Sequence, residues 1–197
     1  KCINDLKGAF ELMLLVTPEN ATSTEIAQMS SLRTQQGTIA VFKKNLNDHI
    51  SIDNSQLILA LDGIQDPGNL GTIMRIADWY GIKNIFCSEK TVDVYNHKVV
   101  QATMGAISRV KVHYCDLEEL FEEYSDVPLY GTFLDGKNIY KSELASTGFI
   151  VFGNEGRGIT PKVSELIKNR LLIPSFPIGV PTSESLNVAV ATSIVCA

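Results

Sequence analysis

The hydrophobic residues of this chain follow two patterns, one typical of strands and one typical of helices, and from residue 57 onward the two patterns alternate regularly. Continuous apolar runs such as LILAL at 57–61 and FIVFG at 149–153 are typical of strands buried on both faces of a parallel sheet. Longer segments with apolar residues at helical spacing lie between such runs. This repeated alternation predicts an α/β domain with a mostly parallel sheet and helices on both faces.

The same two patterns predict the other strands and helices of this domain. Further strands are predicted at 84–88, 109–114, 129–133 and 170–174, and helices at 72–81, 97–107, 116–124, 161–169 and 185–197. In the first helix we expect Ile73, Ile76, Ala77 and Tyr80 to share one apolar face and Gly81 to end the helix.

The first 49 residues have a less regular pattern. It predicts a strand within 11–20, a short helix within 21–32 and a strand within 37–44, which is too little to close a core. The polar, turn-rich stretch 45–56 is a predicted linker. We therefore expect part of a small N-terminal α/β module at 1–50 and a larger domain at 51–197.

Composition narrows the class of protein. The chain has 197 residues, 45% hydrophobic and 20% charged, with a formal net charge of −5. These values are ordinary for a globular protein, and the acidic balance argues against a general nucleic-acid coat. No apolar run is long enough to span a bilayer and no secretory segment is evident, so we expect a cytoplasmic protein with no membrane contact.

Cysteine and histidine are too scattered to indicate a metal site. The four cysteines show no CxxC spacing, and the three histidines form no cluster. We expect reduced thiols and no metal.

Candidate chemistry lies in the loops that follow the predicted strands, because ligands of open parallel sheets bind beyond the carboxyl ends of the strands. Four such loops are rich in glycine, proline and small polar residues, which let a ligand reach the backbone. They are DGIQDPGNLG at 62–71, LDGK at 134–137, NEGRGI at 154–159 and PSFPIGVPTSE at 174–184.

Single residues in these loops each allow two interpretations. Asn69 either caps the following helix or belongs with Arg75 to a polar pair aimed at a phosphate and a ribose hydroxyl. Glu155 is either a charge at a helix start or a hydrogen-bonding group in a ligand site. Ser183 or Ser185 is a plausible cap.

Asn187 is the hardest of these residues to explain structurally. It lies inside an apolar helical run, where its amide needs a polar partner.

Taken together and in order, three strings resemble the signature motifs of the SpoU/TrmH branch of the SPOUT methyltransferases. They are DPGNLGTIMRIADWYG, FIVFGNEGRGI and LLIPSFPIGVPTSESLNVAVATSIVCA, and the resemblance covers about 57–197. The string TIAVFKK more loosely resembles the RNA-binding module that often precedes this catalytic domain.

The resemblance implies a fold, a reaction and a set of partners. It implies a C-terminal trefoil knot with the final helix threaded, and a homodimer with the active site at its interface. It also implies S-adenosyl-L-methionine (AdoMet) as cofactor and transfer of its methyl group to a ribose 2′-OH of RNA. The N-terminal module favours rRNA over tRNA.

Motif positions carry the family's residue roles onto this chain. Catalytic positions are Asn69, Arg75, Glu155, Ser185 and Asn187. Cofactor-binding positions are Thr132, Phe133, Leu134, Gly153, Asn154, Gly156, Ile173, Ser185 and Leu186. The stretch 174–185 is longer than usual in the family, and Ser175-Phe176 stands where many relatives have Met.

Two other readings of the same residues have less support. A catalytically silent RNA-binding protein would have no reason to keep all five catalytic positions. An unrelated doubly wound nucleotide-binding enzyme would carry a glycine-rich first turn of the dinucleotide type, which is missing here.

Overall fold

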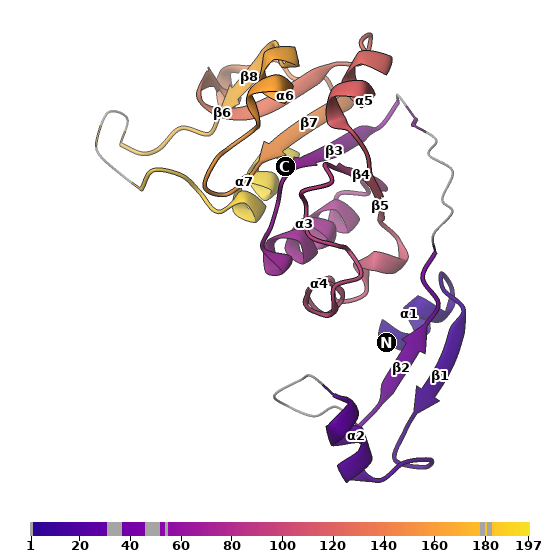
Figure 1. The fold of residues 1–197 in the computed structure, drawn as a ribbon. Coiled ribbons are helices and arrows are strands. Elements are labelled where there is room, and N and C mark those ends of the chain that lie inside the picture. The colour runs from indigo at the N-terminus through magenta and orange to yellow at the C-terminus, as the bar shows by residue number, and fades with distance from the viewer. Residues whose placement is uncertain (1, 31–36, 46–51, 54, 178–179, 181–182) are drawn as a thin grey trace. The chain divides into compact units, whose positions relative to one another are not determined.

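The computed structural model describes residues 2–30, 37–45, 52–53, 55–177, 180 and 183–197. They form two compact units, Lys1–His49 and Ile50–Ala197 (Figure 1). The predicted linker falls largely on 46–51 and 54, outside the described residues.

The N-terminal unit is built around a two-stranded antiparallel sheet. Its elements are α1 (Cys2–Lys7), β1 (Leu12–Val16), α2 (Ser23–Met29) and β2 (Ile39–Phe42), of which only α1 was not predicted. A capping box fixes the start of α2, where Thr22 and Glu25 satisfy each other's backbone N–H groups. Among the described residues of this unit, Val16 and Ile26 are the buried apolar side chains, so its core is small.

A six-stranded sheet forms the centre of the C-terminal unit, in the order β5-β4-β3-β7-β6-β8. The strands are β3 (Leu57–Asp62), β4 (Asn84–Cys87), β5 (Lys111–Tyr114), β6 (Leu129–Asn138), β7 (Gly148–Gly153) and β8 (Asn169–Leu172). Every pairing between neighbouring strands is parallel. The predicted α/β fold with a parallel sheet is confirmed.

Helices cover both faces of this sheet (Figure 1). One face carries α5 (Leu117–Glu123) and α6 (Pro161–Leu166), whose apolar residues form one core cluster with β3, β4 and β7. The other carries α3 (Pro67–Trp79), which packs on α4 (His97–Ala102) and on α7 (Val188–Cys196). Helices α3 and α4 are in close contact, since a Cβ at Gly71 would lie 2.4 Å from the Ala102 Cβ.

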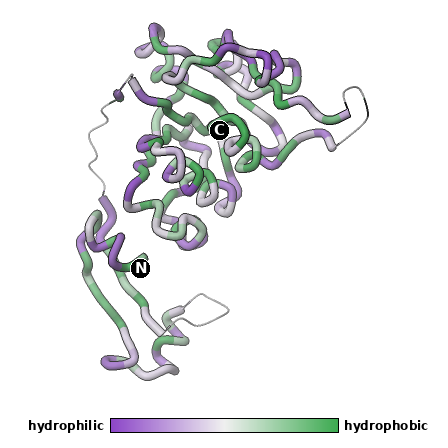
Figure 2. The backbone as a smooth tube through the Cα atoms, turned by 180° about the vertical axis from the view of Figure 1, so that it is seen from behind, coloured by the Kyte–Doolittle hydropathy of each residue, from purple (hydrophilic) through white to green (hydrophobic). Residues whose placement is uncertain are grey.

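Alternate residues of the central strands fill the two cores. Ile58 and Ala60 of β3 belong to the α5–α6 core, and the intervening Leu59 and Leu61, fully buried, face the other side. In Figure 2 the central strands are among the segments coloured green for hydrophobic residues. The continuous apolar runs in the sequence therefore arise from burial on both faces.

Several predicted helix boundaries were wrong. Helix α3, which was predicted at 72–81, begins at Pro67. Tyr80 is 41% exposed and does not belong to the buried face of this helix. The helix predicted at 97–107 ends at Ala102, because Met104 and Gly105 both adopt positive φ, and only a short 3₁₀ turn (η1, Ala106–Ser108) follows.

Two further boundaries differ near the C-terminus. Strand β6 continues through LDGK to Asn138 and is followed by a 3₁₀ turn (η2, Ile139–Lys141). The last helix starts at Val188, so Asn187 caps it instead of lying inside it.

None of the helices in the described part of the chain is long and apolar enough to cross a membrane. Within the same residues, no group of three or more His, Cys, Asp or Glu side chains is placed to hold a metal ion.

Candidate active site

The loops that follow β3 and β7, two neighbouring central strands, meet at the carboxyl end of the sheet. Asp62 and Gly153, the last residues of these strands, lie opposite each other in register. The Asp62 side chain is 3% exposed, and its Oδ2 accepts a hydrogen bond of 2.7 Å from the Thr160 backbone N–H. This buried bond ties the end of the β7 loop to the end of β3.

The NEGRG segment after β7 is a closed hairpin. Asn154 and Gly158 exchange both backbone hydrogen bonds, at 3.0 and 2.9 Å, and Gly158 has a φ of +70°. The Asn154 Oδ1 accepts from the N–H groups of Gly156 and Arg157, while its Nδ2 donates to the Gly63 carbonyl at 2.7 Å. One amide side chain thus shapes the hairpin and joins it to the β3 loop.

Glycine is required at the base of this hairpin. A Cβ at Gly153 would lie 2.2 Å from both the Gly158 carbonyl carbon and the Ile159 nitrogen. These are backbone atoms that cannot rotate away, so any side chain at 153 would open the hairpin.

Three predicted catalytic residues form a continuous chain of hydrogen bonds. The Asn69 Nδ2 donates to the Glu155 Oε1 at 2.9 Å, and the Asn187 Nδ2 donates to the Asn69 Oδ1 at 2.9 Å. The three residues come from motifs separated by up to 118 positions in the chain. The structure therefore brings together the start of α3, the β7 hairpin and the start of α7.

The capping of α3 and α7 explains why the side chains of Asn69 and Asn187 are available for these hydrogen bonds. Asp66 is the N-cap of α3, with Pro67 at the first turn, and its Oδ1 accepts from the Asn69 N–H at 2.8 Å. Asn69 is therefore not the cap, and its side chain is released for other contacts. Asn187 does cap α7, through its Oδ1 and the N–H groups of Ala189 and Val190, and its Nδ2 remains free to donate.

A cavity of about 450 Å³ adjoins this chain of hydrogen bonds. Glu155 lines it, as do Leu186 and Val188 on either side of Asn187. All nine predicted cofactor-binding residues also line it: Thr132, Phe133, Leu134, Gly153, Asn154, Gly156, Ile173, Ser185 and Leu186. Its lining joins apolar walls, exposed backbone, the carboxylates of Glu155 and Glu184 and the guanidinium of Arg157.

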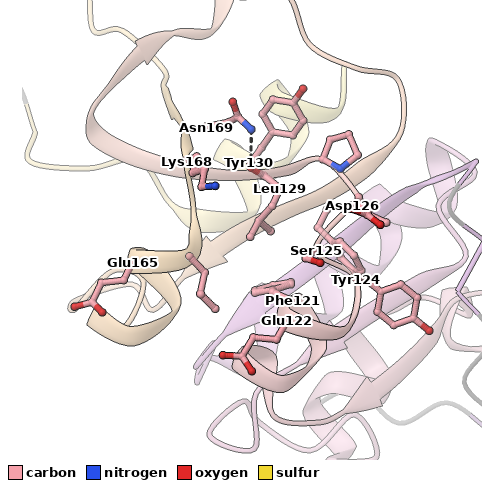
Figure 3. Close-up of a pocket in the computed structure, with 14 residues that line it drawn as sticks. Phe121, Glu122, Tyr124, Ser125, Asp126, Leu129, Tyr130, Glu165, Lys168 and Asn169 are labelled. Atoms are coloured by element: carbon pink, nitrogen blue, oxygen red, sulfur yellow. Dashed lines mark hydrogen bonds between the residues drawn. The ribbon is translucent and has the colours of Figure 1, made fainter.

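A second cavity, of about 620 Å³, lies at the amino ends of β6, β7 and β8 (Figure 3). Its polar lining includes the carboxyl groups of Glu122, Asp126 and Glu165, with Lys168 as its basic residue. None of the predicted site residues lines it. Its larger volume does not make it the better candidate, because neither the loop after β3 nor the hairpin after β7 reaches it.

Arg75 stands apart from the hydrogen-bonded chain. It lies six residues after Asn69, a rotation of roughly 600° at 3.6 residues per turn, so the two side chains leave α3 on different faces. Arg75 is exposed and makes no hydrogen bond or ion pair with the residues that the structure describes. Its guanidinium is therefore available to a ligand or to another chain.

Three groups that hold the site together were not predicted. Asp62 and Asp66 had local signals, since one ends an apolar strand and the other precedes a proline at a helix start. Arg170 had none, because its partners Phe133 and Asp135 are more than 30 positions away. Its hydrogen bonds hold the pKa of Asp135 below the ordinary value.

Comparisons with known proteins agree with this arrangement. Residues 56–197 match the model of the SpoU rRNA Methylase family. The 23S rRNA (guanosine(2553)-2′-O)-methyltransferase RlmP of Bacillus subtilis is 34% identical over 140 residues, which are 70% of this chain and 55% of that protein. An uncharacterized tRNA/rRNA methyltransferase of Synechocystis, slr1673, is 28% identical over 173 residues, 86% of this chain and 62% of that protein. The chain thus spans about 55–62% of the length of these curated relatives.

Solved structures show the same fold. A TrmH-family protein from Porphyromonas gingivalis superposes with a TM-score of 0.88 at 34% identity, covering 100% of this chain and 85% of the other. An AdoMet-bound rRNA methyltransferase from Sinorhizobium meliloti gives 0.86 at 23% identity, with 99% and 82% covered. Because a family model matches most of the chain, and because the motifs of that match meet at one edge of the sheet, this chain belongs to the SpoU rRNA methylase family.

Proposed function

We propose that this chain is an AdoMet-dependent RNA methyltransferase that transfers a methyl group to a ribose 2′-OH. The observation that carries the proposal is the hydrogen-bonded chain Glu155–Asn69–Asn187 at the edge of a ligand-sized cavity. The activity for which the B. subtilis relative is named, 2′-O-methyl transfer to 23S rRNA, supports the reaction.

The cavity suits the cofactor. AdoMet has an adenosine portion, an amino-acid portion and a positively charged sulfonium whose methyl group a nucleophile can take in line. Leu171, Val188 and Ala191 offer apolar surface for the first of these, and the Glu155 and Glu184 carboxylates provide negative charge for the cationic part. The lining of Thr132, Phe133, Leu134, Ile173, Ser185 and Leu186 would hold it, together with the backbone of the 153–156 hairpin.

Arg75 would position the RNA. A guanidinium remains protonated and has no acceptor lone pair, so Arg75 is poorly suited to be the general base. We assign it to the phosphate of the target nucleotide, where a bidentate contact aligns the 2′-OH, and a phosphate or water accepts the proton. Within the site, Glu155 orients Asn69 through their hydrogen bond, and Asn69 and Asn187 together would orient the ribose.

Besides Arg75, three basic side chains, Arg109, Lys111 and Arg157, are candidates for contact with RNA, and two of them lie away from the cavity. Arg109 is held by Asp78 through bonds of 2.8 and 2.7 Å. Lys111 is the first residue of β5, an edge strand of the sheet, and so lies at the amino end of that strand, whereas the site lies at the carboxyl ends of β3 and β7. Arg157, on the hairpin, lines the cavity. Arg157 is thus better placed than Arg109 and Lys111 to meet RNA at the active site.

The proposal includes a homodimer, a threaded C-terminal helix and a cytoplasmic location. Leu186 and Val190, which are 52% and 49% exposed, present apolar surface beside the site that a second copy would cover. Helix α7 packs against both α3 and β7, the position that a helix drawn through a loop at this edge would occupy. The N-terminal unit would contribute RNA contacts, and no metal takes part.

The substrate is rRNA in our proposal, with tRNA as the other outcome of the test. The full chain is incubated with labelled AdoMet and separate rRNA and tRNA pools, and the methylated position is mapped. Label in a 2′-O-methylated nucleotide of rRNA is expected. No transfer to either pool, although the chain binds both AdoMet and RNA, would identify a catalytically silent RNA-binding protein instead.

The assignment of Arg75 has its own test. R75A should lose most methyl transfer while the Kd for AdoMet, measured by calorimetry, changes less than about threefold, since Arg75 is not in the cavity lining. A fully active R75A would refute the role.

A further inference from the structure

Strand β6 carries a four-residue bulge that forms one wall of the 450 Å³ cavity. In the ladder with β8, Thr132 and Lys137 are both registered opposite Leu171, so residues 133–136 leave the ladder. Phe133 and Leu134 of this bulge line the cavity, and Leu134 is 76% exposed. The position of this wall therefore depends on contacts outside the sheet's hydrogen bonds.

A single side chain from β8, Arg170, supplies such contacts. Its guanidinium carbon lies 3.4 Å from the centroid of the Phe133 ring, and its Nε and Nη2 donate to the Asp135 Oδ1 at 3.1 and 2.6 Å. The Nη1 donates to the Ser164 Oγ of α6 at 3.1 Å. The planar fork of arginine uses its face and its edges at once, which lysine cannot reproduce.

The end of the bulge is fixed by backbone contact with the same part of β8. A Cβ at Gly136 would lie 2.5 Å from the Leu171 carbonyl carbon and 2.8 Å from that of Arg170. The bulge thus returns to the sheet at Gly136. Arg170 holds Phe133 and Asp135, the residues on either side of Leu134.

We propose that Arg170 is a positioning residue for the cofactor, which clamps Phe133 and Asp135 so that the wall formed by Phe133 and Leu134 is in place before the cofactor binds. The inference rests on the proposed function, since it takes the 450 Å³ cavity as the AdoMet site. Arg170 does not line this cavity, so its effect passes through the bulge.

The expected signature is a loss of cofactor affinity with little loss of turnover. R170A removes the cation–π contact, the partly exposed ion pair and the hydrogen bond to Ser164. The first two secure the bulge, and their usual strengths correspond together to about a tenfold rise in the Kd for AdoMet. The KM for AdoMet should rise to the same extent, and kcat at saturating AdoMet should stay within about twofold. Calorimetric titration of the full chain with AdoMet gives the affinity without relying on activity.

Two companion variants test the clamp itself. D135A should raise the Kd about threefold, and the double variant R170A/D135A should be no worse than R170A, because both changes break one unit. The Asp135 side chain is 72% exposed, so D135A leaves the fold intact and decides the matter even if R170A does not fold. R170K should fall between wild type and R170A.

Matched controls separate the possible failures. R109A removes another arginine–aspartate pair, with Asp78, and should leave the AdoMet Kd unchanged. S185W places a large ring in the cavity lining and should abolish AdoMet binding. If S185W binds normally, the cavity is not the cofactor site and the proposed function loses its location. If S185W fails to bind while R170A and D135A keep the wild-type Kd, the clamp alone is overturned.

Discussion

Replacing Asn187 tests the central feature of the site, because this one side chain has two separable tasks. Its Oδ1 caps α7 through the N–H groups of Ala189 and Val190, and its Nδ2 donates to Asn69. N187A removes both. N187S keeps a capping hydroxyl but cannot extend an amide donor to Asn69.

The magnitudes of the two losses differ. Loss of the cap costs about 1 kcal/mol, and loss of an exposed hydrogen bond about 0.5 kcal/mol. N187A should therefore lose about 1.5 kcal/mol, which lowers the Tm of a unit of this size by about 3–6 °C. N187S should lose about a third of that. Both variants should be poor in methyl transfer, because Asn69 has lost the donor that orients it.

Thermal unfolding followed by circular dichroism, with methyl transfer to RNA at a temperature well below both transitions, gives the two readouts. Equal destabilisation by serine and alanine would show that the cap is not the source of the stability. A fully active N187S would show that the bond between Asn187 and Asn69 is not needed for the reaction.

Further predictions follow from the hairpin and from the thiols. G153V should open the 153–159 hairpin and raise the Kd for AdoMet at least tenfold, since its Cβ would lie 2.2 Å from backbone atoms; an unchanged calorimetric Kd would contradict this. Burial raises the pKa of Cys115 and of Cys196 to about 11 and raises that of Cys87 as well, whereas Cys2 is exposed. Iodoacetamide at pH 8 should therefore alkylate Cys2 first, and Cys115 and Cys196 should react faster only as the pH rises toward 11, as peptide mass spectrometry would record. Cys87, which is completely buried, should stay unlabelled throughout, and its early labelling would refute the burial argument.

The strands were predictable because burial on both faces leaves an unbroken apolar run, as in Leu57–Leu61. Helix starts were less predictable, because the decisive signal is a short-range cap. Asp66 before Pro67 caps α3, whereas the cap was one of the two interpretations that the sequence allowed for Asn69. The break at Met104 and Gly105 depends on two positive φ angles, which no hydrophobic spacing reveals.

The candidate site could be predicted as a set of motifs that meet in the fold, but not as a set of contacts. Sequence order identified Asn69, Glu155 and Asn187, yet nothing local indicates that the amides donate in series to Glu155. The partners of Asp62 and Arg170 lie 98 and 35 positions away, so only the folded sheet brings them together. Arg75 remains a motif-based prediction, because no contact in the described residues assigns it a role.

The side chain of Asn154, which braces its own hairpin and reaches the Gly63 carbonyl, has a consequence for binding thermodynamics. Because this hydrogen bond joins the two loops in the folded chain, they lose most of their conformational entropy during folding. A ligand that binds here therefore need not order them. Association at this edge should then be fast and accompanied by a small heat-capacity change, in the manner of a rigid receptor. An N154A chain would have to order both loops at the moment of capture, and its association rate constant should fall accordingly.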